Sequence, residues 1–437
     1  MNYIDNIHRA YQWFENNSTE NAVYVTSKEK RLYPEVTGYY IPTLLNYGFR
    51  NKAINFANYL ASTQDVDGSW KPPVVFDVAQ IIDGLSEFEN KYENNIKKAI
   101  QWITLRCKNG KFMNQYQGEI GDHIYMRVAY CLSKTNQDVQ DMVNKITSVY
   151  YNDAIFKFTE VSHFYAYAFE GCARLGLDCK KFVDEISAFE YLPERPNATT
   201  YCYTGLSQIA LSLFLIGEYE KGMKYLEFVT KLQSNNGGFL GSNGVYFSDS
   251  EPSWGVKFYL DAFLEGQKLW FKNNLHIFAS YIEHGDKDER FIFIKNNIKE
   301  SDNVLEVGCG KGRYINNLNC NRFACDIADA SKYVDAKFKI GSCLRLPYDD
   351  NVFDVVFASE VLEHSIFVKN AIEECLRVLK PNGKLLIIDK DARINFNGLH
   401  FGEKWLDFIF IKDKYKAEVN EIKQFSVPFC TAKIIKP

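Results

Sequence analysis

No run of apolar residues in this sequence approaches the length of about 18 that a membrane-spanning helix requires. The N-terminus, Met1-Asn-Tyr-Ile-Asp-Asn6, also lacks the basic and then apolar residues of a secretory signal peptide. The 11 cysteines include no Cys-x-x-Cys pair, so neither a disulfide framework nor a structural zinc site is indicated. We therefore expect a cytoplasmic protein that does not span a membrane and whose cysteines are mostly buried thiols.

The chain has no excess of positive charge either. The net charge is −4 and no block of lysine and arginine occurs, so nucleic acid is not expected as a partner. At 437 residues the chain is longer than one typical domain, and its 46% hydrophobic and 15% aromatic content is ample for burial. Two domains are expected, and the sequence leaves the oligomeric state open.

The most informative stretch is Asn303-Val-Leu-Glu-Val-Gly-Cys-Gly-Lys-Gly312. An apolar strand ends in an acid, Glu306, glycines follow at 308, 310 and 312, and a helix is expected next. Glycine allows a sharp turn with positive φ and a close approach of the backbone to a ligand. A strand that enters a helix through such a turn is the binding element of a doubly wound α/β sheet, although the spacing differs from the G-x-G-x-x-G of nicotinamide enzymes.

The pattern Glu-x-Gly-x-Gly-x-Gly resembles motif I of the class I S-adenosylmethionine (SAM) dependent methyltransferases. The segments downstream follow the order of that family, which implies an α/β Rossmann-like methyltransferase domain over residues 288–437. They are a short strand ending in an acid, the segment after the third strand, a buried parallel strand, a helix and a fifth strand: Arg322–Asp326, Gly341–Pro347, Asn351–Ser359, Ala371–Lys380 and Lys384–Asp389.

The resemblance also implies which residues bind SAM. Asp326 would accept hydrogen bonds from both ribose hydroxyls, and Ser342 and Cys343 would line the adenine pocket. The full set of expected cofactor-binding residues is Glu306, Gly308, Cys309, Gly310, Gly312, Asp326, Ser342, Cys343, Leu344, Ser359 and Glu360.

His364 is the expected catalytic base. It follows the fourth strand, where the acceptor should meet the SAM methyl group, and an alcohol acceptor needs its proton removed during transfer. The alternative is that this histidine only caps the next helix. Glu360, Glu363 and His364, with His400, could instead form a Mg²⁺ site that lowers the pKa of an acceptor hydroxyl. We do not favour the metal, because Glu360 in this family often lies against SAM.

A unit of roughly 40–50 residues recurs from Tyr33 to about Phe271. Its first half is an apolar helix: Thr37–Leu45, Asp77–Leu85, His123–Leu132, His163–Leu175, Tyr201–Leu215 and Trp254–Leu264. The second half is more amphipathic, as in Lys52–Ser62, Lys97–Thr104 and Lys221–Leu232. Six such pairs predict an all-α (α/α) toroid over residues 1–275, and the loops resemble those of toroidal terpene cyclases, prenyltransferases and carbohydrate-active enzymes. An open solenoid is the alternative.

Polar residues on the inner helices would face the centre of the toroid. His123 and Arg127 share one helix face, as do His163 and Tyr167. Such a set suits proton abstraction next to a sugar carboxylate. The alternative is a set of satisfied polar groups in a hydrated core.

Further resemblances direct the prediction toward sugars. Tyr33–Pro42, Phe76–Gly84 and Trp254–Ala262 are similar to toroidal proteins of bacterial surface-polysaccharide pathways, and Leu362-Glu-His364 is similar to polysaccharide-locus methyltransferases. The resemblance implies an O-methyltransferase whose acceptor is a sugar or nucleotide sugar in capsule or surface-polysaccharide biosynthesis. The alternative is a methyltransferase for a small molecule or protein, with the toroid as a protein-docking module.

Overall fold

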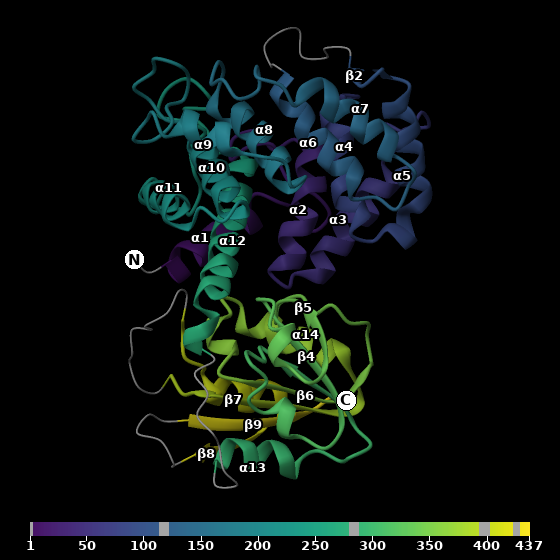
Figure 1. Ribbon diagram of the computed structural model, residues 1–437, viewed down its shortest axis with the longest axis vertical. Coiled ribbons are helices and arrows are strands. Elements are labelled where there is room, and N and C mark those ends of the chain that lie inside the picture. Colours follow the sequence, from purple (N-terminus) through teal and green to yellow (C-terminus); the bar gives the residue numbers. More distant parts are fainter. Residues whose placement is uncertain (1–2, 113–121, 279–287, 393–402, 423–428) are drawn as a thin grey trace. The chain divides into compact units, whose positions relative to one another are not determined.

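The computed structural model describes residues 3–112, 122–278, 288–392, 403–422 and 429–437 (Figure 1). The chain divides into two compact units. The N-terminal unit comprises Met1–Leu44 and Arg50–Gly266, and the C-terminal unit comprises Leu45–Phe49 and Gln267–Pro437. Among the described residues, no helix is both long enough and apolar enough to cross a membrane.

The N-terminal unit is built from helices, apart from the short strands β1 (Cys107–Lys108) and β2 (Lys111–Phe112) and a 3₁₀ turn at Asp122–Ile124. The sequence pattern predicted the even-numbered helices, and their existence is confirmed with bounds within a few residues, except that α12 continues past the predicted Leu264 to Phe278. The helices are α1 Tyr3–Asn16, α2 Pro34–Asn46, α3 Arg50–Ser62, α4 Val75–Ser86, α5 Glu89–Thr104, α6 Tyr125–Ser133, α7 Gln140–Tyr150, α8 Ser162–Arg174, α9 Lys180–Ile186, α10 Tyr203–Leu215, α11 Tyr219–Lys231 and α12 Ser253–Phe278.

The even-numbered helices are apolar on most sides and pack against one another. In α10, every residue from Tyr203 to Phe214 is buried, as expected for a helix surrounded by protein. Glycine permits the closest approach: a Cβ at Gly38 in α2 would lie 2.7 Å from the Cα of Ile81 in α4. Successive even-numbered helices are therefore direct neighbours.

The last of the even-numbered helices, α12, also contacts the first one, α2. The Tyr40 hydroxyl donates to the carbonyl of Ser253 (2.7 Å), and the Thr43 hydroxyl donates to the Asp261 carboxylate (2.7 Å). As one advances along α2 the contacts also advance along α12, so the two helices run parallel. The other neighbouring pairs behave alike: Gln80 and Asp83 of α4, for example, contact Arg127 and then Lys134 beyond it. The first turns of these helices consequently lie at one end of the unit.

The C-terminal unit contains a seven-stranded mixed sheet with the order β5-β4-β3-β6-β7-β9-β8. The five strands from β3 to β7 pair in parallel, and β9 runs antiparallel to both β7 and β8. The parallel part confirms the predicted doubly wound, Rossmann-like sheet, whereas β8 and β9 were not predicted. The strands are β3 Asn303–Val307, β4 Asn321–Asp326, β5 Lys337–Ile340, β6 Phe353–Ser359, β7 Leu379–Lys390, β8 Glu418–Ile422 and β9 Phe429–Ile435.

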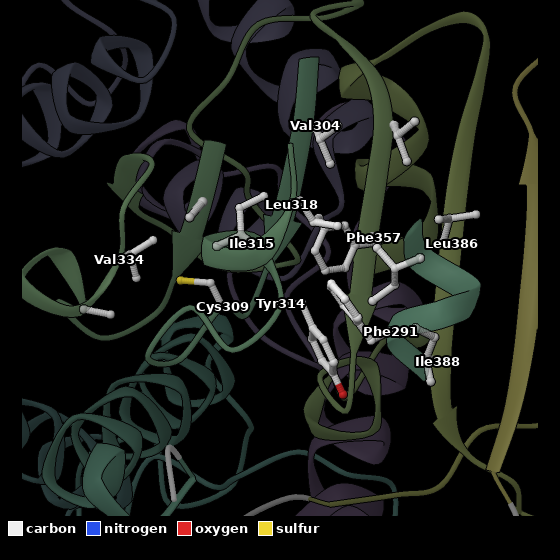
Figure 2. Packing of buried hydrophobic residues seen from close by; sticks show 14 of the residues in the cluster. Phe291, Val304, Cys309, Tyr314, Ile315, Leu318, Val334, Phe357, Leu386 and Ile388 are labelled. Carbon is white, nitrogen blue, oxygen red and sulfur yellow. The ribbon is translucent and has the colours of Figure 1, made fainter. Parts of the chain in front are cut away.

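Both faces of this sheet are covered. Successive residues of a strand point to opposite faces, and β6 buries Val355, Val356, Phe357 and Ala358 in turn. The helices of the unit are α13 (Glu289–Asn296), α14 (Val368–Val378) and α15 (Phe408–Tyr415). Figure 2 shows the core on one face, where Phe291 of α13 packs with Tyr314, Phe357 and Ile388.

The predicted helix directly after Gly312 is wrong. The chain there forms turns and one 3₁₀ turn at Ile315–Asn317. Gly312 has a φ of +77°, which is incompatible with a right-handed helix, and the asparagines that follow favour turns over helix. The loop is therefore held by specific hydrogen bonds and not by a helix.

Candidate active site

The three glycines after β3 have positive φ, at +69°, +50° and +77° for Gly308, Gly310 and Gly312. The N–H of Gly308 donates to the carbonyl of Cys325 (2.7 Å), which fixes the loop against β4. A Cβ at Gly308 would lie 2.2 Å from the Cγ2 of Val361, whereas a Cβ at Gly310 would have no heavy atom within 4 Å. Gly308 is thus packed against protein, and Gly310 borders open space.

Asp326 ends β4 beside this loop. Its two carboxylate oxygens accept from the N–H groups of Gly310 (2.8 Å) and Ala328 (3.0 Å), which fix its orientation. Burial raises the pKa of Asp326 above its usual value. Each carboxylate oxygen has a second lone pair, so the fixed side chain can still accept hydrogen bonds from a ligand.

Glu306 lies beneath the loop and is 3% exposed. Its carboxyl accepts from the N–H of Ile315 (3.0 Å), so this predicted SAM-binding residue also holds the chain that follows the glycines. Burial raises the pKa of Glu306 to about 8, with Asp326 adding to the effect. The folded protein therefore holds a proton on Glu306 at pH values where the unfolded chain has lost it.

This raised pKa predicts a pH dependence of stability. Between the ordinary pKa of glutamate and about pH 8, the folded state binds more protons than the unfolded state, so stability falls as the pH rises. Glu306→Gln removes the titration, and the variant should gain about 1–3 kcal/mol relative to the wild type between pH 5.5 and pH 8. Urea denaturation of the full chain at both pH values measures this, with Glu300→Gln, an exposed residue, as the control. Equal pH dependence in variant and wild type would contradict the assignment.

The segment after β5 lies beside Asp326, because the N–H of Gly341 donates to the Asp326 carbonyl (2.9 Å). The Ser342 hydroxyl accepts from the N–H of Leu344 (3.2 Å), which shapes a tight turn. Cys343 is half-buried, and burial raises its pKa to about 11, so its sulfur stays a neutral thiol. The segment that holds Ser342 and Cys343, the two residues expected at the adenine, thus lies next to the residue expected at the ribose.

At the end of β6 the chain turns sharply. Glu360 has a φ of +57°, a conformation that costs free energy for a residue with a side chain and occurs most often at functional sites. Its carboxylate accepts from Arg290 (2.6 Å). The hydroxyl of Ser359 is buried and has no hydrogen-bond partner among the described residues. No sequence motif pointed to Arg290, which lies in α13, 70 residues before Glu360.

His364 sits one turn further along, in the 3₁₀ segment Leu362–His364. Its Nε2 is 3.6 Å from the carboxylate of Glu363, and its ring meets the ring of Phe271 edge-on with centroids 5.1 Å apart. A carboxyl oxygen and an aromatic ring thus border the imidazole of His364.

Glu363 and Asp389 form an acidic pair at the ends of β6 and β7. Lys390 donates to Glu363 (2.6 Å), and the N–H of Glu363 donates to Asp389 (3.3 Å). Burial is the main cause that raises the pKa of Glu363 to about 9 and that of Asp389 to about 7. Ligands of parallel α/β sheets bind at this edge, and here it carries ionisable side chains.

The donor set does not fit the Mg²⁺ site considered from the sequence. Glu360 is paired with Arg290 and Glu363 with Lys390, so neither carboxylate is available without breaking an ion pair. Within the described residues, no group of three or more His, Cys, Asp and Glu side chains is arranged to hold a metal ion. His400 lies outside those residues.

In the N-terminal unit, Arg127 is neutralised by two carboxylates, Asp83 (2.8 Å) and Glu170 (3.0 Å). His123 pairs with Glu160, and the ring of His163 hydrogen-bonds the amide of Gln208 (2.9 Å). Arg127 and His163 thus belong to one hydrogen-bonded network through Glu170 and Gln208, whereas His123 is paired separately. This geometry favours the structural interpretation of Arg127 over binding of a sugar carboxylate.

Comparison with known proteins agrees with this geometry. Residues 305–387 match the model of a methyltransferase domain. A sterol 24-C-methyltransferase of Kluyveromyces lactis is 29% identical over 155 residues, which are 32% of this chain and 38% of that protein. An uncharacterized protein of Methanocaldococcus jannaschii is 32% identical over 162 residues, 34% of this chain and 77% of that protein. The chain therefore spans well under half the length of the sterol methyltransferase it matches.

Two solved structures are also similar. A SAM-dependent methyltransferase of Thermotoga maritima, a possible histamine N-methyltransferase, is 19% identical with a TM-score of 0.30 and covers 38% of this chain and 93% of that chain. A structure described as a novel alpha-amylase from Clostridium perfringens is 14% identical with a TM-score of 0.48 and covers 60% of this chain and 97% of that chain. TM-scores this low do not establish a common fold.

A glycine loop after the first strand of a parallel sheet, with an acid at the end of the neighbouring strand, is the arrangement typical of domains that bind a nucleoside-containing cofactor. The match over residues 305–387 specifies the cofactor class. Through this domain the chain belongs to the class I SAM-dependent methyltransferases.

Proposed function

We propose that this protein transfers a methyl group from SAM to a hydroxyl of a sugar or a sugar-linked group, in cytoplasmic steps of bacterial surface-polysaccharide assembly. The main support for methyl transfer is the contact between Gly310 and Asp326. It orients the Asp326 carboxylate, whose remaining lone pairs can accept hydrogen bonds, beside the open space at Gly310. SAM bound there supplies an electrophilic methyl on a sulfonium. Asp326 would hold the ribose, Ser342 and Cys343 the adenine, and Ser359 and Glu360 the far end of the cofactor.

His364 is the proposed catalytic residue. As the acceptor oxygen forms its bond to the methyl group and the bond from the methyl to sulfur breaks, the hydroxyl proton would pass to the imidazole, whose Nε2 lies 3.6 Å from the Glu363 carboxyl group. Phe271 packs against the ring and limits its rotation. The protein thereby supplies orientation and a proton acceptor, which are the main requirements of an in-line transfer.

His364→Asn should lower kcat about 10²–10⁴-fold with the Kd for SAM unchanged within about twofold, because general-base catalysis contributes about that much. The acidic limb of the pH–rate profile should disappear with it, a change that a purely structural role would not produce. Phe271→Leu is the control, since it removes the packed ring and leaves the proton acceptor in place. If His364→Asn keeps most of its kcat, His364 caps the following segment and is not the base.

The N-terminal unit is proposed to be a closed (α/α) toroid that holds the acceptor. The contacts from α12 back to α2 support a closed ring over the open solenoid, because the terminal helices of a solenoid have no contact with each other.

The acceptor class rests on two supports. One is the resemblance of the sequence to polysaccharide-pathway proteins. The other is the edge of the sheet at the end of β7, where the half-buried Lys390, hydrogen-bonded to Glu363, favours a polar molecule over an apolar one. The relative of Kluyveromyces lactis is a sterol methyltransferase, but the match covers only 38% of that protein, so the sterol is not carried over.

The experiment that tests this function is transfer of labelled methyl from SAM to a panel of nucleotide sugars, oligosaccharides, lipid-linked glycans, sterols and cell-extract proteins. Label in a sugar fraction, absent with the His364→Asn variant, is the expected result. Label in sterol or protein, or none in any glycan while SAM still binds, would contradict the sugar acceptor. Label in protein together with a stable co-purifying partner would instead support the docking role of the N-terminal unit.

A further inference from the structure

The first turns of the even-numbered helices gather polar and aromatic side chains at one end of the N-terminal unit. Glu35 begins α2, Asp77 begins α4, His163 begins α8 and Trp254 begins α12. Because these helices run parallel, their first turns lie at the same end. None of these side chains takes part in the methyl-transfer chemistry described above.

Glu35 and Asp77 form a buried acidic pair, 7% and 3% exposed. The Tyr33 hydroxyl donates to the Asp77 carboxylate (3.1 Å). Burial and the charge of Asp77 raise the pKa of Glu35 well above its usual value, and the nearby Lys257 is committed to Asp261 (2.9 Å). One carboxyl of the pair therefore keeps its proton and can donate a hydrogen bond, while the other accepts.

The titratable groups that face Glu35 come from several elements. They are Tyr33 in the preceding loop, Tyr39 on α2, Asp77 on α4, Tyr167 on α8, Tyr246 in the loop before α12, and Lys257 on α12. Burial raises the pKa of each of these four tyrosines, so their hydroxyls stay protonated at neutral pH. The cluster thus presents hydroxyl donors and one charged acceptor.

Aromatic rings surround the acidic pair. The ring of Tyr167 lies 4.8 Å from that of Phe76, 4.6 Å from the imidazole of His163 and 5.8 Å from the ring of Phe258. Tyr33, Phe164, Tyr246 and Phe247 are only half-buried, and the ring of Tyr246 meets the rings of His163 and Phe164. Ring faces next to carboxyl and hydroxyl groups match a molecule with an apolar face and a polar edge.

Two buried polar groups in this part of the unit have no hydrogen-bond partner among the described residues: the amide nitrogen of Gln80 and the hydroxyl of Thr204. Both side chains belong to residues that are 0% exposed. Gln80 lies one turn below Asp77 on the same face of α4, and Thr204 is in the first turn of α10. A buried amide without a partner costs free energy unless a ligand or water pairs with it.

We propose that this end of the N-terminal unit is a second binding site, separate from the SAM site, that takes an uncharged pyranose ring of a saccharide. A sugar ring has apolar C–H faces for the aromatic rings and hydroxyls for Glu35, Asp77 and Gln80. A uronic acid is disfavoured, because Asp77 would repel its carboxylate and Arg127 is already neutralised by Asp83 and Glu170. The inference rests on the proposed function and narrows its acceptor to an uncharged sugar, but it is tested by binding alone.

The test applies the full-length protein at pH 7, without SAM, to an array that carries neutral, N-acetylated and uronic-acid oligosaccharides. Binding to neutral or N-acetylated glycans and not to polyuronates is expected. Hydrogen exchange with the glycan that binds best should show protection at the first turns of α2, α4 and α8. Binding to no glycan, preferential binding to polyuronates, or protection confined to the C-terminal unit would overturn the proposal.

Variants separate this site from the methyltransferase. Asp77→Asn should weaken glycan binding about tenfold or more, because a charged acceptor becomes neutral. Tyr33→Phe, at a half-buried ring that leaves the fold intact, should weaken it about threefold or more. Asp141→Asn, an exposed carboxylate on α7, is the control and should change nothing. Glycan binding that is indifferent to both variants overturns the proposal, whereas binding without methyl transfer contradicts only the proposed function.

Discussion

Asp326→Asn should weaken SAM binding at least about 30-fold while the protein stays folded. The Asp326 carboxylate is fixed by two backbone N–H groups and retains a lone pair on each oxygen for the ribose hydroxyls. Hydrogen bonds to a charged group contribute about 1.5–3 kcal/mol, and asparagine replaces one of the two oxygens by a donor. Titration calorimetry with SAM measures the change in Kd.

Asp335→Asn is the matched control, because this carboxylate in the same unit has a side chain that is 79% exposed and pairs with Arg322. Circular dichroism of both variants establishes that they are folded. Equal SAM affinity in Asp326→Asn and wild type would show that the cofactor lies elsewhere.

The second large effect separates two neighbouring glycines. Gly308→Ala should lower the melting temperature of the C-terminal unit by about 5–10 °C, because the new Cβ would lie 2.2 Å from Val361 in a left-handed backbone conformation. Gly310→Ala should lower it by only about 2–4 °C, the effect of backbone strain alone. It should weaken SAM binding about tenfold or more, since its Cβ would enter the open space beside the loop.

Calorimetric melting and SAM titration of the two variants give four values, which distinguish packing from ligand contact. A Gly310→Ala variant with wild-type SAM affinity would contradict the role of that space. A Gly308→Ala variant as stable as Gly310→Ala would mean that the Val361 side chain can move aside without lowering the melting temperature.

The glycine loop and the parallel strands could be predicted because local physics specifies them. Only glycine adopts the left-handed conformation freely at three alternate positions, and β6 is apolar along nearly its whole length. The even-numbered helices were predictable for a similar reason, since α10 is apolar on all sides.

Other features depend on contacts distant in sequence. Strand β8 (Glu418–Ile422) is largely exposed at the sheet edge, and its polar sequence gives no strand signal until β9 pairs with it. The Arg290–Glu360 and Lys390–Glu363 pairs join residues of separate elements, so no local sequence motif could predict them. These ion pairs also occupy the carboxylates of Glu360 and Glu363, which the sequence spacing had left as possible ligands of a metal ion.

The acidic pair of Glu35 and Asp77 shows the same limit. Each residue was visible as a polar position on an apolar helix, but their proximity depends on the parallel packing of α2 and α4. The sequence spacing instead suggested Arg127 as a binding residue, but in the structure Arg127 forms ion pairs with Asp83 and Glu170.

The central claim is that the loop after β3 and the acid at the end of β4 bind SAM. Titration of the full-length protein with SAM, followed by hydrogen exchange of the complex, tests it most directly. The account predicts saturable one-to-one binding, competition by S-adenosylhomocysteine, and protection at residues 307–312 and around Asp326. No binding, or protection that leaves both segments unchanged, would contradict it.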